Sequence, residues 1–410
     1  MATVVFKNAR VFDGFSAEPL ENACVVVEGE HIRAVEPRFT PVAGAEVVDC
    51  AGRTLMPGMI DAHVHVYASS CNLSAVARNL PSYNAAFAVR FLRHALDCGL
   101  TSVRDAGGAD VGLARALRDG LFAGSRLHYG GKMISQTGGH GDFRLPDESP
   151  PLCGCCGHMD GLAILADGVP ELRRAVREEL RRGATHIKIM ASGGVASPSD
   201  PLERCQFSDE EIEAVVDEAT RAGSYVAAHC HPAEAIRRCA ALGVKSIEHG
   251  TLIDSSTAAF VAERGAYIVP TMAVIFALHD DGARLGLPPA SIEKLNKIVE
   301  RSLDGLQIMK RAGVKMGFGT DLLGPHYVRQ CTEFTLRRQV LEPIDILRSV
   351  CAINAEVLGK AGSLGCIAPD AAADILIVDG DPLSDIGVLA ENGTRLPIIM
   401  KAGAFHRRTL

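Results

Sequence analysis

The sequence predicts an α/β protein, a (β/α)8 TIM barrel with a small β-sandwich domain formed by both chain ends. Three observations support this fold class. Apolar strand-like runs alternate with helical patterns in the middle of the chain, both ends carry short alternating strands, and 410 residues suit one barrel with an appendage. We expect the sandwich to comprise residues 1–56 and 359–410, and the barrel to comprise residues 57–358.

The strands expected in the end domain are short and are separated by turn residues such as Asp13-Gly14, Gly29-Glu30 and Asn392-Gly393. They are Thr3–Val11, Ala23–Glu28, His31–Val35, Ala45–Cys50, Ala373–Asp379 and Leu396–Ala402.

Eight apolar runs are expected to form the barrel strands, each with a helical pattern after it. They are Leu55–Val66, Leu100–Arg104, Arg126–Ile134, Thr185–Met190, Tyr225–His229, Val244–Glu248, Ala266–Pro270 and Val314–Gly319. One of the helices should begin at a capping box, in which Ser208 and Glu211 satisfy each other's free backbone N–H groups.

Charge and hydropathy exclude several classes of protein. The net charge is −7, whereas a chain that neutralises phosphates is usually basic, so we expect no nucleic-acid partner. No apolar run reaches the ~18 residues of a membrane span, and the first residues lack the basic and apolar regions of a signal peptide. We therefore expect a cytoplasmic protein without a membrane partner.

The 13 cysteines are scattered along the chain, as expected for reduced thiols rather than a disulfide framework. Cys153, Cys155 and Cys156 form a tight cluster. No second pair of cysteines or histidines with zinc-site spacing lies near it, so we interpret the cluster as part of a long loop of small residues.

Polar residues that can bind metal lie at the ends of five of the expected barrel strands. Strand period two turns His63 and His65 toward the same side, into the barrel mouth. Chance placement of such groups at one end of a single barrel is improbable, and imidazoles with carboxylates suit Zn²⁺ or a similar divalent ion. The set is His63, His65, Lys188, His229, His249 and Asp321.

Lys188 is the unusual member, because an ammonium cannot bind a cation. Reaction of its amine with CO₂ would give an anionic carbamate with two oxygens, which can bridge two metals about 3.5–4 Å apart. We therefore predict two divalent ions, zinc by preference, and an N6-carboxylated Lys188.

The segment Leu55-Met-Pro-Gly-Met-Ile-Asp-Ala-His-Val-His65 resembles the opening of the amidohydrolase superfamily, and the remaining candidate ligands match its binuclear branch. Lys188-Ile-Met-Ala-Ser-Gly-Gly-Val195, Ala228–His231 and Ser246–Gly250 resemble the imidazolonepropionase-like group. Its members that look most similar are metal-dependent carboxypeptidases and dipeptidases, with prolidase-type enzymes and ochratoxin-type amidases among them.

The resemblance implies a role for each ligand. His63, His65 and Asp321 would hold one metal, His229 and His249 the other, and carboxylated Lys188 would bridge them. A bridging hydroxide would attack the scissile amide, and Asp321 would take its proton and deliver it to the leaving amine. The resemblance also implies a homo-oligomer, with an octamer as one form.

Candidate contacts to a small-molecule substrate are His140, His231, Ser192 and Gly194. His140 lies in a Gly-rich loop and could bond the scissile carbonyl or a substrate carboxylate, and we also assign it to the catalytic residues. His231 shares the inward face with His229, and an alternative assignment makes His231 the ligand. We prefer His229 because it closes the apolar strand, whereas Pro232 already begins the next element.

We expect an amidohydrolase that cleaves the amide bond to a C-terminal amino acid, in a dipeptide or an N-acyl amino acid. A cyclic amide hydrolase or deaminase is disfavoured by Pro232, which stands where mononuclear deaminases carry glutamate, and by the presence of Lys188. A phosphotriesterase or lactonase could use the same metal shell. A non-catalytic relative with this fold would typically have lost ligands, and here each expected ligand is present.

Overall fold

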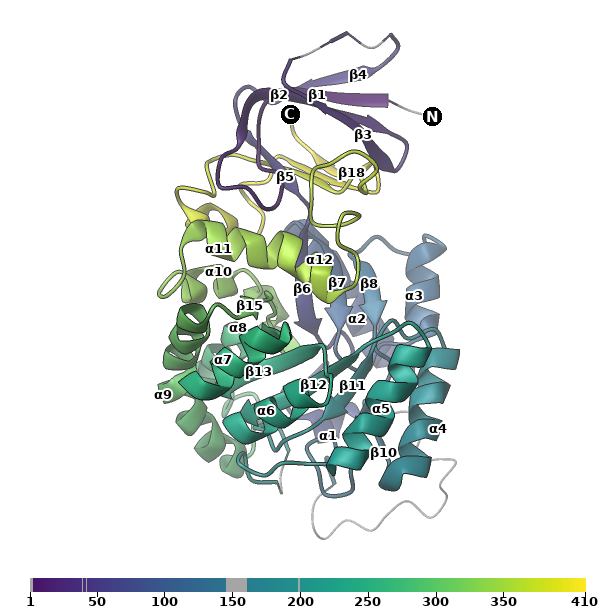
Figure 1. The fold of residues 1–410 in the computed structure, drawn as a ribbon. Coiled ribbons are helices and arrows are strands. Elements are labelled where there is room, and N and C mark those ends of the chain that lie inside the picture. Colours follow the sequence, from purple (N-terminus) through teal and green to yellow (C-terminus); the bar gives the residue numbers. More distant parts are fainter. Residues whose placement is uncertain (1–2, 39, 42, 145–160, 198–199) are drawn as a thin grey trace.

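The structure is a computed structural model that describes residues 3–38, 40–41, 43–144, 161–197 and 200–410. Strands from the two chain ends gather at one end of the molecule, and a barrel surrounded by helices forms the other (Figure 1). Cys153, Cys155 and Cys156 lie outside the described residues.

Strands from both chain ends pair in one eight-stranded sheet with the order β18-β17-β16-β5-β1-β2-β3, in which β4 also pairs with β1. Strand β5 joins the two ends, because it pairs parallel to β1 on one side and antiparallel to β16 on the other. Phe6, Leu55 and Ile375 pack in one apolar core under this sheet. A two-sheet sandwich stays a prediction. The strands are Thr3–Val11 (β1), Leu20–Glu28 (β2), His31–Glu36 (β3), Glu46–Asp49 (β4), Thr54–Pro57 (β5), Ile375–Val378 (β16), Ile398–Lys401 (β17) and Ala404–Arg408 (β18).

The barrel consists of parallel strands whose backbone hydrogen bonds run around a closed ring. Strands β6, β7 and β8 form one sheet and β9 to β15 form another. Thr185 N donates to Tyr129 O across one seam, and Ala62 N donates to Phe318 O across the other. The strands are Met59–Val64 (β6), Leu100–Asp105 (β7), Arg126–Tyr129 (β8), Met133–Ser135 (β9), Ala163–Leu165 (β10), Ile187–Met190 (β11), Val226–Pro232 (β12), Ser246–Leu252 (β13), Tyr267–Val269 (β14) and Lys315–Met316 (β15).

Helices follow the barrel strands and cover the outside of the ring (Figure 1). The capping box at Ser208 and Glu211 is confirmed at the start of α5. The helices are Leu73–Val76 (α1), Pro81–Asp97 (α2), Val111–Arg118 (α3), Gly168–Arg181 (α4), Asp209–Arg221 (α5), Ala233–Ala241 (α6), Ser255–Arg264 (α7), Met272–Asp281 (α8), Pro289–Ala312 (α9), Thr332–Arg337 (α10), Pro343–Arg348 (α11) and Asn354–Val357 (α12). Short helical turns are Gly324–Arg329 (η1), Ser349–Ile353 (η2) and Ile386–Leu389 (η3). None of the helices in the described ranges combines the length and the hydrophobicity that a membrane span requires.

Two runs predicted as single strands are each divided. The run Leu55–Val66 supplies β5 to the end sheet and β6 to the barrel, with Gly58 between them, where a Cβ would lie 2.2 Å from the Thr101 hydroxyl. The run Arg126–Ile134 breaks at Gly130-Gly131, because Gly131 adopts a left-handed φ of 71°. Apolar continuity alone does not reveal such breaks.

Candidate metal centre

Most of the candidate ligands lie at the carboxyl ends of barrel strands, which meet at one edge of the ring. His63 is on β6, Lys188 on β11, His229 on β12 and His249 on β13, and all four are buried. His65 directly follows β6, and Asp321 lies in the loop a few residues after β15. Parallel strands of a barrel place these ends together, so residues far apart in sequence form one cluster.

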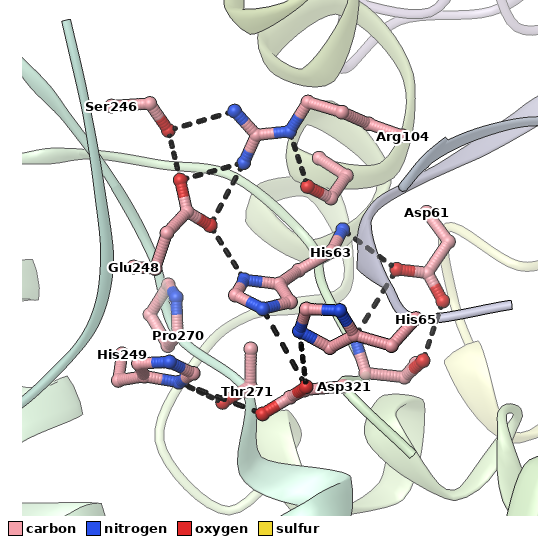
Figure 2. A network of polar contacts seen from close by, with 12 residues as sticks. Asp61, His63, His65, Arg104, Ser246, Glu248, His249, Pro270, Thr271 and Asp321 are labelled. Carbon is pink, nitrogen blue, oxygen red and sulfur yellow. Dashed lines mark hydrogen bonds and ion pairs between the residues drawn. The ribbon is translucent and has the colours of Figure 1, made fainter. Parts of the chain in front are cut away.

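Asp321 lies within reach of three histidines (Figure 2). Its Oδ1 lies 3.5 Å from Nε2 of His63 and 3.4 Å from Nε2 of His65, and its Oδ2 lies 4.0 Å from Nδ1 of His249. Ligand atoms of His63, His249 and Asp321 are all within 4.8 Å of one another, which is close enough for one ion to reach all three.

The backbone is strained at two of these positions. His249 has a φ of 71° and Asp321 a φ of 54°, in the left-handed region that residues with a Cβ rarely adopt. Such strain costs about 1–3 kcal/mol per residue and persists where the surroundings over-determine it, often at functional sites. Here it aims both side chains into the cluster.

Hydrogen bonds through Nδ1 orient the rings of His63 and His65, and Figure 2 shows the bond of His63 to Glu248. Nδ1 of His63 lies 2.6 Å from Oε2 of Glu248, and Nδ1 of His65 lies 2.7 Å from the carbonyl oxygen of Gly107. Both acceptors select the tautomer that leaves Nε2 with its lone pair directed at the cluster. Burial lowers the pKa of His65 to about 4 and that of His63 well below its usual value, so both rings are neutral at pH 7, as ligands must be.

Arg104 holds the Glu248 carboxylate that orients His63. Its Nη2 donates to both carboxylate oxygens of Glu248, at 2.7 and 2.8 Å, and both side chains are fully buried. A buried ion pair between Arg104 and Glu248 therefore fixes the ring of His63, a candidate ligand.

The Arg104→Leu variant should lose roughly 3–5 kcal/mol in free energy of unfolding, because it leaves the Glu248 carboxylate buried without its partner. Urea denaturation measures this loss. Arg338→Leu is the matched control, because Arg338 forms an exposed ion pair with Asp385 that should contribute little. Equal stability of the two variants would contradict the account of the buried pair.

Lys188 is 1% exposed and lines the same cavity as the histidines. Burial lowers the pKa of its amine, which raises the share of the neutral form. A neutral amine is the form that reacts with CO₂.

His229 and His231 both face the cluster. The ring centroid of His249 lies 4.6 Å from that of His229 and 5.1 Å from that of His231. Nε2 of His229 lies 3.1 Å from the carbonyl oxygen of Gly193, and Nδ1 of His231 lies 3.2 Å from the hydroxyl of Thr251. Each ring therefore keeps one nitrogen for another partner, and the assignment of His229 as ligand stays a prediction.

His140 is brought to the cluster from the loop after β9. Its ring stacks on that of His229 with centroids 4.2 Å apart, and its Nδ1 lies 2.8 Å from Oγ of Ser197. Ser197 in turn donates to the buried carboxylate of Asp200, while Gln206 accepts from the His140 backbone N–H at 3.0 Å. This network fixes the imidazole ring of His140 through Nδ1 and leaves its Nε2 pointing away from Ser197.

Ser192 and Gly194 lie beneath the cavity rather than on it. The Ser192 hydroxyl accepts from the backbone N–H of His231 at 3.0 Å. A Cβ at Gly194 would lie 2.3 Å from Cε1 of His140, so this glycine leaves the room that the ring occupies. Their contribution to the cavity is to position His231 and His140.

The cavity has a polar floor and an apolar wall, with about 670 Å³ of empty space including its opening. Its lining comprises His65, Leu73, Met133, His140, Phe143, Lys188, Met190, Val195, Ala196, His229, His231, His249, Thr271, Val274, Ile275, Leu278, Leu295, Ile298, Asp321 and Leu323.

The donor set fits a divalent ion. Nε2 of His63 is buried and, among the described residues, has no hydrogen-bond partner, which is costly unless another group engages it. It points at a carboxylate and at further imidazoles, a combination of ligands typical of zinc.

Metal affinity should fall on acidification. Burial raises the pKa of Asp321 to about 7, and an ion can bind this carboxylate only after its proton leaves. Below pH 7 each unit of acidification should therefore weaken binding by up to about tenfold. Zinc titration calorimetry at pH 6 and pH 8 measures both the affinity and the protons released. Equal affinity at the two pH values would contradict Asp321 as a ligand.

Sequence reasoning missed the residues that orient the histidines of the site, above all Glu248, Thr271 and Ser197. Thr271 Oγ1 lies 2.7 Å from Nδ1 of His249. Only Glu248 carried a signal, because it is an acidic residue within an apolar strand and directly precedes a candidate ligand.

Comparison with known proteins extends this picture. Residues 54–402 match the model of the amidohydrolase family. Ochratoxinase of Aspergillus niger is 33% identical over 393 residues, which cover 91% of this chain and 81% of that protein.

Solved structures agree along the whole chain. A prolidase complexed with N-methylphosphonate-L-proline has a TM-score of 0.97 at 44% identity, and the match covers 100% of both chains. A Xaa-Pro dipeptidase with methionine bound in its active site has a TM-score of 0.89 at 28% identity, covering 99% of this chain and 100% of the other.

Proposed function

Because this chain belongs to the amidohydrolase family, and is therefore a hydrolytic enzyme, we propose that it cleaves the amide bond between an acyl group and a C-terminal amino acid with a free carboxylate. The observation that carries the proposal is the pairing of the His63, His249 and Asp321 cluster with His140 and His231 in one cavity.

The proposal includes two divalent ions, preferably zinc, with Lys188 carboxylated between them. His63, His65 and Asp321 would hold one ion and His229 and His249 the other. When bound, the ions would lower the pKa of a water molecule and polarise the scissile carbonyl. The burial of Lys188 among these residues supports the carboxylation.

Asp321 acts as the general base. Its position between three imidazoles allows it to take the proton of the attacking water and pass it to the leaving amine. Neutral histidines around it do not compete for that proton, because burial keeps their pKa values low.

His140 and His231 bind the substrate carboxylate or the scissile carbonyl. Both line the cavity, and neither is needed for the proposed metal shell. A carboxylate offers them charge-assisted hydrogen bonds. In the proposed function these two histidines make the enzyme select amides of amino acids. A homo-oligomer, with an octamer as one form, stays part of the proposal.

The carboxylate requirement is tested with matched substrates. We expect N-acyl amino acids to have a kcat/KM at least about 10²-fold above that of the same compounds as C-terminal amides, because blocking the carboxylate leaves buried polar groups unpaired. The measurement uses metal-loaded enzyme and an assay of released amino acid or amino acid amide. If amidated substrates, lactones or phosphotriesters turn over as well as the free acids, the amino-acid specificity is wrong.

A further inference from the structure

Two helices supply five of the twelve apolar residues that line the cavity, and these five residues are called the α8–α9 wall below. Val274, Ile275 and Leu278 lie on α8, and Leu295 and Ile298 lie on α9. The pairs Val274/Leu278 and Leu295/Ile298 have the spacing of neighbours on one helix face. All five side chains are buried and belong to one apolar cluster. The wall is therefore a continuous apolar surface.

The wall is continuous with the reacting centre. Helix α8 begins at Met272, directly after Thr271, whose hydroxyl lies 2.7 Å from Nδ1 of His249. A group joined to the scissile carbonyl would therefore enter apolar surroundings within a few bonds of the cluster.

Charge in the cavity is confined to its floor. Among the described residues of the lining, Asp321 is the one carboxylate, and it is engaged with the three histidines. Lys188 is the one lysine of that lining, and the remaining ionisable groups are histidines. The nearby Lys294 donates its Nζ to the carbonyl oxygens of Gly194 and Ser197, at 3.0 Å each. No free carboxylate of the described lining can pair with an ammonium.

We propose that the α8–α9 wall is the subsite for an uncharged, apolar acyl group, so that the enzyme prefers N-acyl amino acids to free dipeptides. This inference rests on the proposed function and selects between its two substrate classes. A dipeptide carries an α-ammonium on the carbon next to the scissile carbonyl, and at this wall the ammonium loses its water without gaining a carboxylate partner among the described lining residues. An acyl chain loses nothing there and buries apolar surface.

Two substrates with the same skeleton isolate this effect. L-Leu-L-Phe and 4-methylpentanoyl-L-Phe differ only in the α-amino group. With metal-loaded wild-type enzyme at pH 7, the acyl compound should have a kcat/KM on the order of 10²-fold higher. From pH 7 to pH 9 the amine, with a pKa of about 8, loses its proton, and the ratio should fall by about tenfold. Ionisable groups of the enzyme affect the kcat/KM of both substrates equally, so their titration cancels in this ratio.

A matched pair of variants tests the wall itself. Val274→Asp supplies a carboxylate and Val274→Asn a neutral group of the same shape, and neither change replaces a candidate metal ligand. Relative to the Asn variant, the Asp variant should shift the preference about tenfold toward L-Leu-L-Phe. The pH series on wild-type enzyme tests the same inference if either variant fails to fold.

The outcomes distinguish failure of the apolar acyl subsite from failure of the proposed amide hydrolysis. Equal kcat/KM for the two wild-type substrates at pH 7, or a ratio that does not change with pH, overturns the apolar subsite and leaves amide hydrolysis intact. Hydrolysis of neither substrate class overturns the proposed function, and the apolar subsite with it.

Discussion

Replacement of Asp321 by asparagine should abolish most turnover while the protein stays folded. The amide cannot accept the proton of the attacking water, and general acid–base catalysis contributes ~10²–10⁴-fold. The loss should be at least in that range and larger if metal binding also weakens. Asp321 lies 3.4–4.0 Å from three imidazole nitrogens, so the isosteric change alters charge and leaves the packing in place.

The measurement is kcat at saturating metal and substrate, with the metal content of each sample determined. Asp254→Asn is the matched control, because Asp254 is the N-cap of α7 and asparagine also caps helices well. A near-wild-type kcat for Asp321→Asn would mean that another group is the base.

Removal of the Lys188 amine should have the second large effect. Lys188→Ala should lose at least one of the two ions and most of the activity, because the bridging carbamate cannot form. For the wild-type apoprotein, added bicarbonate should aid reconstitution by metal, and it should not do so for the variant. Lys245→Ala is the control, because Lys245 is a partly buried lysine that bonds Glu356 O outside the cavity.

The carbamate would be contradicted if Lys188→Ala still bound two ions per chain. It would also be contradicted if bicarbonate had no effect on reconstitution of the wild-type apoprotein. Metal analysis before and after dialysis against a chelator distinguishes these results from simple weakening of affinity.

The barrel and the cluster could be predicted because both follow from periodic features of the sequence. Most of the candidate ligands sit at or shortly after the end of an apolar run, and parallel strands in a ring bring those ends together. His63, His249 and Asp321 do lie together in the structure, although they are 258 positions apart at the extremes, and their role as metal ligands stays a prediction. The left-handed φ of His249 and Asp321 had no sequence signal, since neither is glycine.

The groups that orient the ligands could not be predicted, because their partners lie across the barrel rather than along the chain. Glu248 bonds His63 from a strand 185 positions away, and Arg104 reaches Glu248 from a third strand. The apolar wall was also hidden, because buried helix faces such as that of α8 have the same composition whether they meet another helix or a cavity.

A crystal structure of the metal-loaded protein, with the ions located by anomalous scattering, tests the binuclear metal centre most directly. We predict two ions per chain, one beside His63 and His65 and one beside His229 and His249, with the Lys188 side chain extended by a carboxylate between them. A single ion per active chain beside an unmodified Lys188 would contradict the account.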